Sequence, residues 1–517
     1  MCDLIFHNAN AITMDPVHSR AELIAIQDGK ILLTGGNELL SSLTSRKTRA
    51  VDCAGRTVLP GFIDAHCHLH AYAESLVSLN LSPKEGVRSI SVIQEKIRRF
   101  CEKLPPGNWI RGKSYNEFYL AERRHPDRRD LDAAALLHPV KLTHRSGHAH
   151  VLNSLALKIA GIGEETGDPP GGMIDRDSTG LPTGILYGLG SYLAERIPPL
   201  DEAETERGAV LANEKLLSCG ITSVQDASPV NGPAQWRRFV KWKVNGILQP
   251  RITMMTGLDS SAVPDPLDWS SQLGADELRL GGTKIIANEV TGSLHPTQKE
   301  LDEAVCAIHA AGRQAAIHAI EEPVIEAALR AIESALKRNF RKDHRHRIEH
   351  CSLCRPELLR RLARAGVTVV TQPAFIYFSG DRYLQTVPPD QLEYLYPVRS
   401  MLDAGLLVGA GSDCPIADPN PLLSMWAAIT RMTEEGAALP QQRIGLLDAI
   451  KLHTINAAAS AFEDGIKGSL TPGKAADVVM LSENIFEADQ GRIKDVQVVL
   501  TVLGGEVVRS SSSISNL

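Results

Sequence analysis

The sequence predicts an α/β protein built on a (β/α)8 barrel, with a small composite β-sandwich domain from both termini and an insertion after the first barrel strand. Three observations support this prediction. The chain has 517 residues, which is enough for one large barrel with additional parts. Eight short apolar runs alternate with amphipathic segments in its middle, and both ends contain only short strand patterns. An open, doubly wound sheet is the main alternative architecture.

Residues 1–57 are predicted to form the first part of the β-sandwich. The apolar runs 21–26 and 30–34 flank Gln27-Asp28-Gly29, which is a hairpin turn signal. Residues 461–517 are predicted to form the second part, because 476–481 and 496–503 again have strand character. Neither end is large enough to bury a core alone, so we expect the two ends to pair in one domain.

Residues 58–460 are predicted to form the barrel. Its eight strands are expected at 61–68, 221–225, 251–255, 283–287, 314–318, 347–350, 367–371 and 406–410. Amphipathic helical segments such as 201–219, 297–311 and 446–459 separate or follow them. The interval of about 105–200 is too long for one crossover helix and is predicted to be an insertion. Insertions after barrel strands lie on the carboxyl-terminal face, so we expect this one to form part of a roof over a site there.

The composition excludes several classes of protein. Hydrophobic residues make up 43% and charged residues 22%, and the net charge of −6 is spread without long blocks of one sign. A nucleic-acid partner is therefore not expected. The first residues lack a basic segment followed by a long apolar core, and no apolar run approaches the length of a membrane span. We expect a cytoplasmic protein without a membrane partner.

Nine cysteines without a regular framework are typical of a reducing compartment. Cys351 and Cys354 form an isolated CxxC spacing. A chance spacing is favoured over a zinc ribbon or redox site, because no second pair accompanies it.

Histidines occupy every second position at the end of the first predicted strand. Side chains alternate along a strand, so His66, His68 and His70 would point to one side, where imidazoles can bind a transition metal. Ordinary hydrogen-bonded histidines would give the same pattern. His70 lies beyond the strand end and is only a candidate pocket residue.

Further polar residues coincide with the ends of other predicted strands. Since the carboxyl ends of barrel strands meet at one rim, these side chains are expected to gather there. The candidate metal-ligating set is His66, His68, Lys284, His318, His350 and Asp413.

Several short motifs resemble those of a known family. Signatures similar to those of the amidohydrolase superfamily occur at 60–68 (PGFIDAHCH), 318–320 (HAI), 347–350 (RIEH) and 411–413 (GSD). A closer resemblance, to the YtcJ-like group that includes N-substituted formamide deformylase, rests on 147–149 (GHA), 153–157 (NSLAL) and 180–184 (GLPTG). The resemblance covers nearly the whole chain and implies a barrel with a composite β-sandwich.

The resemblance implies one or two Zn²⁺ ions, or another divalent metal. His66 and His68 would bind one metal, and His318 and His350 would bind a second or complete the first. Asp413 would be a ligand and would accept a proton from bound water; a turn aspartate before Pro415 is the alternative.

Lys284 is implied to be carboxylated by CO₂, which would give an anionic carbamate able to bridge two metals. An ammonium group beside Zn²⁺ would be repelled, so an unmodified lysine must lose its charge or stand away from the metal. A neutral or salt-bridged barrel lysine is the alternative.

The predicted reaction is metal-dependent hydrolysis of an amide-type C–N bond in a small molecule. A metal lowers the pKa of bound water and polarises the substrate carbonyl. Asp413 would act as general base and acid, and His318 or His148 would hydrogen-bond the developing oxyanion. A cyclic amide hydrolase, lactonase or ring deaminase on the same barrel is one alternative, and a non-catalytic binding protein is another.

Candidate substrate-binding residues are His148, Tyr115, Asn288, Phe375 and Tyr377, although buried packing is the more common role of such aromatic side chains. Asn288 begins a stretch, 288–295, that departs from the Asp-Gly and Gly-Ser-Arg text of the similar proteins, and Glu321-Glu322 replaces their Gly-Asp. The pocket wall is therefore expected to differ from theirs. Barrel proteins of this kind often form homodimers, but the sequence carries no interface signature.

Overall fold

A computed structural model describes residues 2–258, 273–274, 276–290 and 293–512. The chain divides into two compact units. One contains residues 1–69 together with 213–517, and the other contains residues 70–212. The second unit ends at Ala212 and the first resumes at Asn213, so the boundary lies within the helix α7 (Glu202–Ser218).

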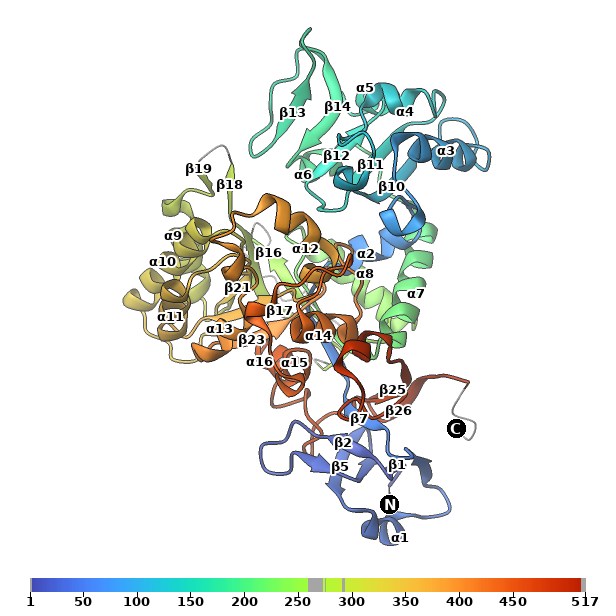
Figure 1. Cartoon of the computed structure of the whole chain (residues 1–517), viewed down its shortest axis with the longest axis vertical. Helices are drawn as coiled ribbons and strands as arrows, with labels where there is room; N and C mark the ends of the chain where they lie inside the picture. The colour runs from blue at the N-terminus through green and yellow to red at the C-terminus, as the bar shows by residue number, and fades with distance from the viewer. Residues whose placement is uncertain (1, 259–272, 275, 291–292, 513–517) are drawn as a thin grey trace. The chain divides into compact units, whose positions relative to one another are not determined.

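The centre of the first unit is a parallel eight-stranded sheet in which the strands follow one another in sequence order, from β8 to β23. All eight predicted strands are confirmed, with boundaries that differ by a few residues (Figure 1). They are β8 (Phe62–Cys67), β15 (Ile221–Asp226), β16 (Arg251–Gly257), β17 (Leu278–Ile286), β20 (Ala315–Ala319), β21 (Arg347–His350), β22 (Thr368–Thr371) and β23 (Leu407–Ala410).

Backbone hydrogen bonds between the first strand and the segment after the last one join the two edges of this sheet. The amide of Asp413 donates to the carbonyl of His66 at 2.7 Å, and the amide of His68 donates to the carbonyl of Cys414 at 2.9 Å. These bonds join the end of β8 to the segment that follows β23. The predicted barrel is thereby confirmed, and the open-sheet alternative is wrong.

Helices cover the outside of this barrel because each has one apolar face. In α10 (Glu322–Arg338) the buried residues Ile325, Leu329 and Ile332 recur at helical spacing. The neighbouring α9 (Gln298–Ala310) begins with a capping box, in which Thr297 and Glu300 each accept a hydrogen bond from the other's backbone amide. The two helices lie side by side with α11 (Pro356–Arg364) in Figure 1.

The two ends of the chain share a sheet, as predicted. β7 (Thr57–Pro60) from the amino-terminal part pairs antiparallel with β24 (Val478–Leu481) from the carboxyl-terminal part. Their six-stranded sheet has the order β26 (Glu506–Ser510), β25 (Val498–Leu503), β24, β7, β2 (Asn10–Ile12), β3 (Arg20–Ala21). A four-stranded sheet lies next to it, with the order β5 (Lys30–Gly35), β4 (Leu23–Gln27), β1 (Leu4–His7), β6 (Arg49–Asp52). Phe6, Val58 and Val478 contribute to their common core. β7 leads directly into the first barrel strand and therefore fixes its start.

The second unit has its own mixed sheet, of order β13 (Met173–Arg176), β14 (Pro182–Tyr187), β12 (Ala149–Leu152), β11 (Val140–His144), β10 (Ile110–Tyr115), β9 (Leu79–Asn80). Its core packs one face of this sheet against α3 (Ile90–Cys101) and α4 (Arg128–Asp132). The predicted insertion of about 105–200 is the central part of this unit, and its role as a roof stays a prediction.

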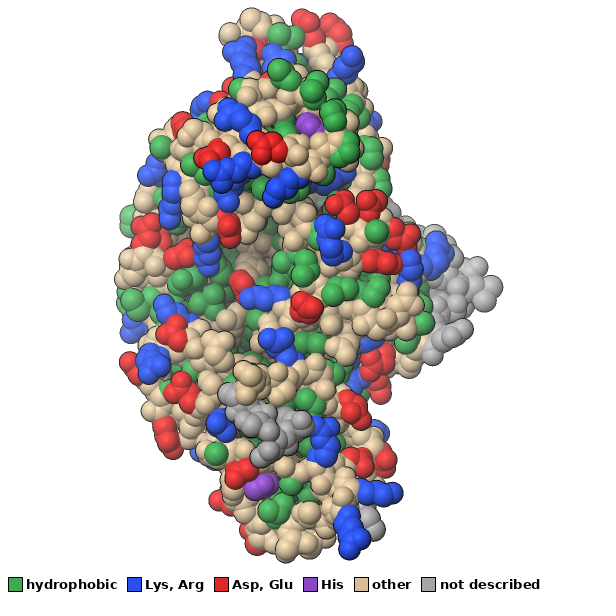
Figure 2. All heavy atoms as spheres, turned by 90° about the vertical axis from the view of Figure 1, so that its right-hand side faces the viewer, with side chains coloured by type: hydrophobic (Ala, Val, Ile, Leu, Met, Phe, Trp, Pro, Cys, Tyr) green, Lys and Arg blue, Asp and Glu red, His purple; other side chains and the backbone are tan. Residues whose placement is uncertain are grey.

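On the face drawn in Figure 2, acidic and basic side chains are interspersed. Among the described residues, no helix has the length and apolar character that crossing a membrane requires. All nine cysteines are free.

Candidate metal centre

The closest group of potential ligands lies where the first and last barrel strands meet. His66 ends β8 and His68 follows it, while Asp413 follows β23. One ligand atom from each of the three lies within 4.8 Å of the others. His68 Nε2 is 3.0 Å from Asp413 Oδ1, and His66 Nε2 is 3.6 Å from the same oxygen. The predicted pairing of the two histidines with Asp413 is therefore seen in the geometry.

The other three residues of the predicted set adjoin this group. Lys284 on β17 places its Nζ 3.5 Å from His66 Nε2. The ring centroid of His350, at the end of β21, is 4.9 Å from that of His66, and the ring of His318 on β20 is 4.5 Å from that of His350. All six predicted residues thus belong to one continuous cluster, and every one except His68 is buried.

Three of the histidines are held from outside through Nδ1. His66 Nδ1 lies 2.5 Å from Glu349 Oε2, His68 Nδ1 lies 3.2 Å from Ser228 Oγ, and His350 Nδ1 lies 2.7 Å from Gln372 Oε1. Each ring therefore keeps Nε2 for the centre. Outer partners of this kind fix the tautomer and orientation of metal-binding histidines.

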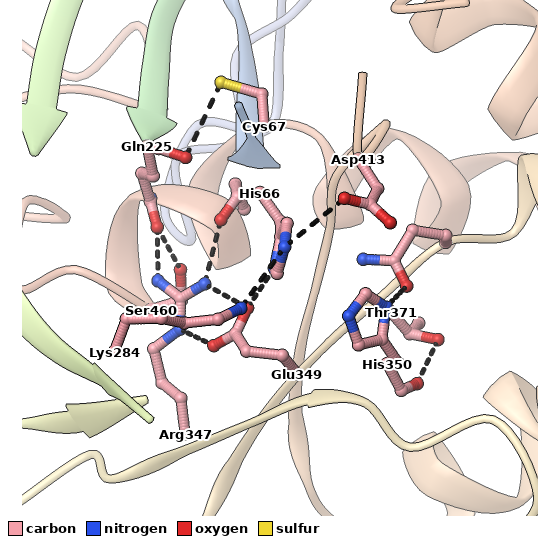
Figure 3. Close-up of polar contacts among 12 residues, drawn as sticks. His66, Cys67, Gln225, Lys284, Arg347, Glu349, His350, Thr371, Asp413 and Ser460 are labelled. Carbon is pink, nitrogen blue, oxygen red and sulfur yellow. Dashed lines mark hydrogen bonds and ion pairs between the residues drawn. The ribbon is translucent and has the colours of Figure 1, made fainter. Parts of the chain in front are cut away.

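Glu349 is itself clamped by a buried arginine (Figure 3). Arg347 Nε donates to Glu349 Oε1 at 2.7 Å, and its Nη2 donates to Oε2 at 2.9 Å. The same guanidinium donates to the carbonyl of Ala65 at 2.8 Å and to Gln225 Oε1. This bidentate contact fixes the orientation of the Glu349 carboxylate toward His66 Nδ1. Sequence reasoning missed the role of Glu349, although the residue lies inside the RIEH motif.

Two buried aspartates fix the segments that carry the ligands. Asp226 accepts hydrogen bonds from the amides of Leu69 at 2.6 Å and Ser228 at 3.0 Å, which orders the turn after His68. Asp64 accepts from the amide of Ser412 at 2.9 Å, directly before Asp413. Burial raises the pKa of Asp64 to about 6, although the hydrogen bonds from Ser412 oppose the rise.

Two members of the cluster have left-handed backbone conformations. His350 has φ of 73° and Asp413 has φ of 57°. Residues other than glycine rarely adopt this region, and such positions concentrate at functional sites. His350 is the last residue of β21, and Asp413 lies three residues after the end of β23.

The charges of the cluster are shifted by burial and by their neighbours. Burial lowers the pKa of Lys284 to about 8, although the carboxylates of Glu349 and Asp413 oppose the shift. Burial would raise the pKa of Asp413, but the hydrogen bond from His68 and the nearby histidines outweigh it and hold the pKa well below its usual range. Burial also lowers the pKa of His66. The centre thus combines the neutral imidazole of His66 with the ionised carboxylate of Asp413.

Comparison with known proteins agrees with this geometry. Residues 49–509 match the amidohydrolase family. The chain belongs to that family. It is 30% identical over 539 aligned residues to N-substituted formamide deformylase from Arthrobacter pascens, an alignment that covers 98% of each protein. It is 27% identical to the putative amidohydrolase YtcJ of Bacillus subtilis, with 98% of this chain and 99% of that protein covered.

Among solved structures, this amidohydrolase-family chain is similar to an uncharacterised metal-dependent hydrolase from Pyrococcus horikoshii. The TM-score is 0.74 at 22% identity, and the match covers 94% of this chain and 99% of the other. That likeness supports the fold.

The donors in this amidohydrolase-family member are suitable for a divalent transition metal. Two imidazole Nε2 atoms and a carboxylate oxygen converge, with His66 and Asp413 buried and His68 half-buried, and these are the atom types that bind Zn²⁺. Asp64, Cys67 and Cys414 also lie close together, but Asp64 already accepts hydrogen bonds from Ser412. The hydrogen bond between the two thiols and their burial raise the pKa of Cys67, and a protonated thiol is a poor ligand.

The predicted pocket residues lie in two different parts of the molecule. Tyr115 and His148 belong to the 70–212 unit. Tyr115 is buried in the core of that unit, and its hydroxyl is 3.0 Å from His125 Nδ1. His148 is exposed between two strands. The structure therefore assigns packing to Tyr115, whereas a role of either residue toward substrate stays a prediction.

The remaining pocket residues belong to the barrel unit. Asn288 is half-buried at the start of β18 (Asn288–Val290). Thr291 and Gly292, which belong to the stretch 288–295 that differs from the similar proteins, lie outside the described residues. Phe375 and Tyr377 lie on α12 (Ala374–Thr386). The amide of Phe375 donates to the carbonyl of Gln372 at 3.0 Å, which places this ring one turn from the residue that holds His350.

Proposed function

We propose that this chain hydrolyses an amide-type C–N bond in a small molecule with the help of bound metal. The observation that carries the proposal is the arrangement of His66, His68 and Asp413, whose donor atoms converge while Glu349 and Ser228 hold the outer nitrogens. The similarity to a protein named N-substituted formamide deformylase supports the class of bond.

His66, His68 and Asp413 would hold the first metal, and His318, His350 and Lys284 would complete it or hold a second. Zn²⁺ suits these donors best. When bound, such an ion acts as a Lewis acid that lowers the pKa of water and polarises a carbonyl group.

Asp413 is the residue that would move the proton. Its carboxylate is ionised at neutral pH, so it can accept a proton from the attacking water and pass it to the leaving nitrogen. His68 Nε2 lies 3.0 Å from Asp413 Oδ1 and orients that oxygen. His318 or His148 would donate a hydrogen bond to the developing oxyanion.

Lys284 is suited to carboxylation because its amine is buried, and its pKa of about 8 leaves a larger uncharged fraction than in an ordinary lysine. The free amine would form a new N–C bond to CO₂ and release a proton, which replaces a cation by an anionic carbamate. The exchange of charge removes the repulsion between an ammonium group and a metal.

The test combines metal analysis of the purified protein with a substrate panel. The panel contains N-substituted formamides, linear amides, lactams, lactones and ring amines. We expect stoichiometric zinc and release of an amine with an acid. Release of ammonia from a ring, or opening of a lactam or lactone, would favour the alternative hydrolases. Full metal content without turnover on any compound would favour a binding protein.

A K284A variant tests the bridging lysine separately. We expect it to lose one metal and most activity, and ¹³C-labelled CO₂ should give a carbamate signal in the unmodified protein only. A variant that keeps two metals and full activity would contradict the bridging role.

A further inference from the structure

Three basic side chains lie together on one face of the sheet in the 70–212 unit. Arg111 and Lys113 are on β10 (Ile110–Tyr115), and Lys141 is on the neighbouring parallel strand β11 (Val140–His144). Arg111 is directly opposite Lys141 in the register, and Lys113 is two residues further along β10. Because side chains alternate along a strand, all three project from the same face, named here the cationic face.

Acidic groups compensate only part of this charge. Lys113 Nζ is 3.3 Å from Glu74 Oε2, and Glu74 is shared with His70. Arg111 donates to the carbonyl of Pro198, which is a neutral acceptor. Within the described part of the chain, Lys141 has neither a hydrogen-bond partner nor an ion-pair partner. Like charges opposite each other in a sheet are destabilising, so this arrangement calls for a counter-ion.

A buried histidine on the next strand provides an independent observation. His150 on β12 (Ala149–Leu152) is the cross-strand neighbour of Thr143, whose hydroxyl is 3.2 Å from His150 Nδ1. Thr143 is two residues from Lys141, so His150 lies on the cationic face as well. His150 is 5% exposed, yet its Nε2 has no hydrogen-bond partner among the described residues. A buried polar atom of this kind indicates a missing partner.

The electrostatics agree with the geometry. Burial, together with the charges of Lys113 and Arg111, lowers the pKa of Lys141 to about 8. Burial and the charge of Lys141 also lower the pKa of His150. Two acids act on the cationic face. Glu74 opposes the lowering of the pKa of Lys141 and of Arg111, and Glu204 opposes the lowering at Arg111. Both shifts arise first from burial, and the neighbouring positive charges add to them.

We propose that the cationic face binds an oxyanion, a carboxylate or a phosphate, between the ammonium group of Lys141 and the Nε2 of His150. The anion would accept charge-assisted hydrogen bonds from Lys141, with Arg111 and Lys113 adding positive potential, and would accept a hydrogen bond from the neutral imidazole. All the residues involved lie within the 70–212 unit. The proposal therefore stands apart from the metal centre and from the proposed hydrolysis.

The experiment is calorimetric titration of the full-length, metal-loaded protein with inorganic phosphate and, separately, with acetate. We expect saturable binding of at least one anion, and the stronger of the two identifies the source of the natural ligand. In K141M we expect Kd to rise about tenfold or more, since a hydrogen bond to a charged group is lost. K141R keeps the charge and should retain most of the affinity.

The matched control is K158M, which removes an exposed lysine from α5 (Ser154–Ile159) of the same unit. It should bind the anion as the unmodified protein does. K141M should also melt at the same or a higher temperature than the unmodified protein in anion-free buffer, because it removes a half-buried charge that lies opposite Arg111. Absence of saturable binding, or binding that K141M leaves intact, would overturn the proposal; in the latter case the anion binds elsewhere, for example at the metal.

Discussion

Two clusters of histidines lie at opposite ends of the barrel strands, and their ring nitrogens are used differently. At the carboxyl ends, His66, His68 and His350 have Nδ1 bound to an outer partner and Nε2 left for the centre. At the amino ends, His309 and His346 lie in direct contact, with Nδ1 of the first 2.8 Å from Nε2 of the second. A short distance between imidazole rings is found in both clusters, so it does not distinguish a candidate metal centre from a structural cluster.

The hydrogen bonds of the second cluster determine every tautomer. The amide of Ala315 donates to His346 Nδ1 at 2.9 Å, so the proton of that ring is on Nε2 and is donated to His309 Nδ1. His309 Nε2 then donates to the carbonyl of Asn339 at 2.6 Å. Every ring nitrogen of this pair is used within the protein, and none remains for a metal.

His344 completes the same cluster. Its Nδ1 accepts the amide of His346 at 2.9 Å, and its Nε2 donates to the carbonyl of Ala365 at 2.8 Å. The comparison teaches that the direction of the unused nitrogens, more than the number of histidines, marks the functional site.

The largest expected effect comes from a ligand of the metal centre. H66A should lose bound metal, and hydrolysis should fall about a thousandfold or more, because a metal contributes several kcal/mol of charge stabilisation to the transition state. Elemental analysis and initial rates measure both. H309A, the control from the other cluster, should keep its metal. Equal metal loss in the two variants would contradict the functional difference between the clusters.

A substitution in the structural cluster should instead lower stability. H346A leaves the Ala315 amide and His309 Nδ1 without partners, which should reduce the free energy of unfolding by about 2–4 kcal/mol. Urea unfolding followed by circular dichroism measures the change, and metal content per folded protein should be unchanged. A fully stable variant would show that the hydrogen-bond chain is dispensable.

A milder effect is expected when the outer partner of His66 is altered. E349Q keeps the shape of the side chain but weakens its hold on the imidazole, so metal affinity should fall about 10–100-fold. Competition with a chromogenic chelator measures the affinity. E357Q, on the exposed face of α11, is the matched control, and the same affinity in both variants would remove Glu349 from the centre.

The smallest expected effect is a loss of folding stability as the pH falls. Burial lowers the pKa of His346 to about 2, whereas an unfolded histidine has a pKa of about 6.5. The unfolded state therefore binds the proton first, and the contribution of His346 is complete above about pH 6.5 and is lost as the pH falls below it, by up to about 1.4 kcal/mol per pH unit. Urea unfolding of metal-free protein between pH 7.5 and 5 tests this slope, which should be smaller in H346A.

The sequence predicted the barrel well because the barrel strands and helices leave local signals, whereas the metal-ligating roles of the predicted residues stay predictions. Alternation of apolar runs and amphipathic segments identified all eight strands. His66, Lys284 and Asp413 each lie near the carboxyl end of a barrel strand. Once the strand is predicted, the position of the residue at its end is predicted with it.

The parts that sequence reasoning missed depend on pairs of residues distant in the chain. Nothing near His309 indicates that it will meet His346, and nothing near Lys141 indicates that it will lie opposite Arg111. Tyr115 looked like a pocket residue but is fully buried in the core of the 70–212 unit. Packing of this kind follows from tertiary contacts, which a single sequence does not display.

The hydrogen bonds that close the barrel have a consequence for biosynthesis. Asp413 and Cys414 pair with His66 and His68, so the first ligands made wait for almost the whole barrel to be synthesised. Contacts of such long sequence separation are typical of slow-folding topologies. A nascent chain that has not yet emerged past Cys414 presents His66 and His68 without Asp413, so the candidate ligand set is complete only late in synthesis.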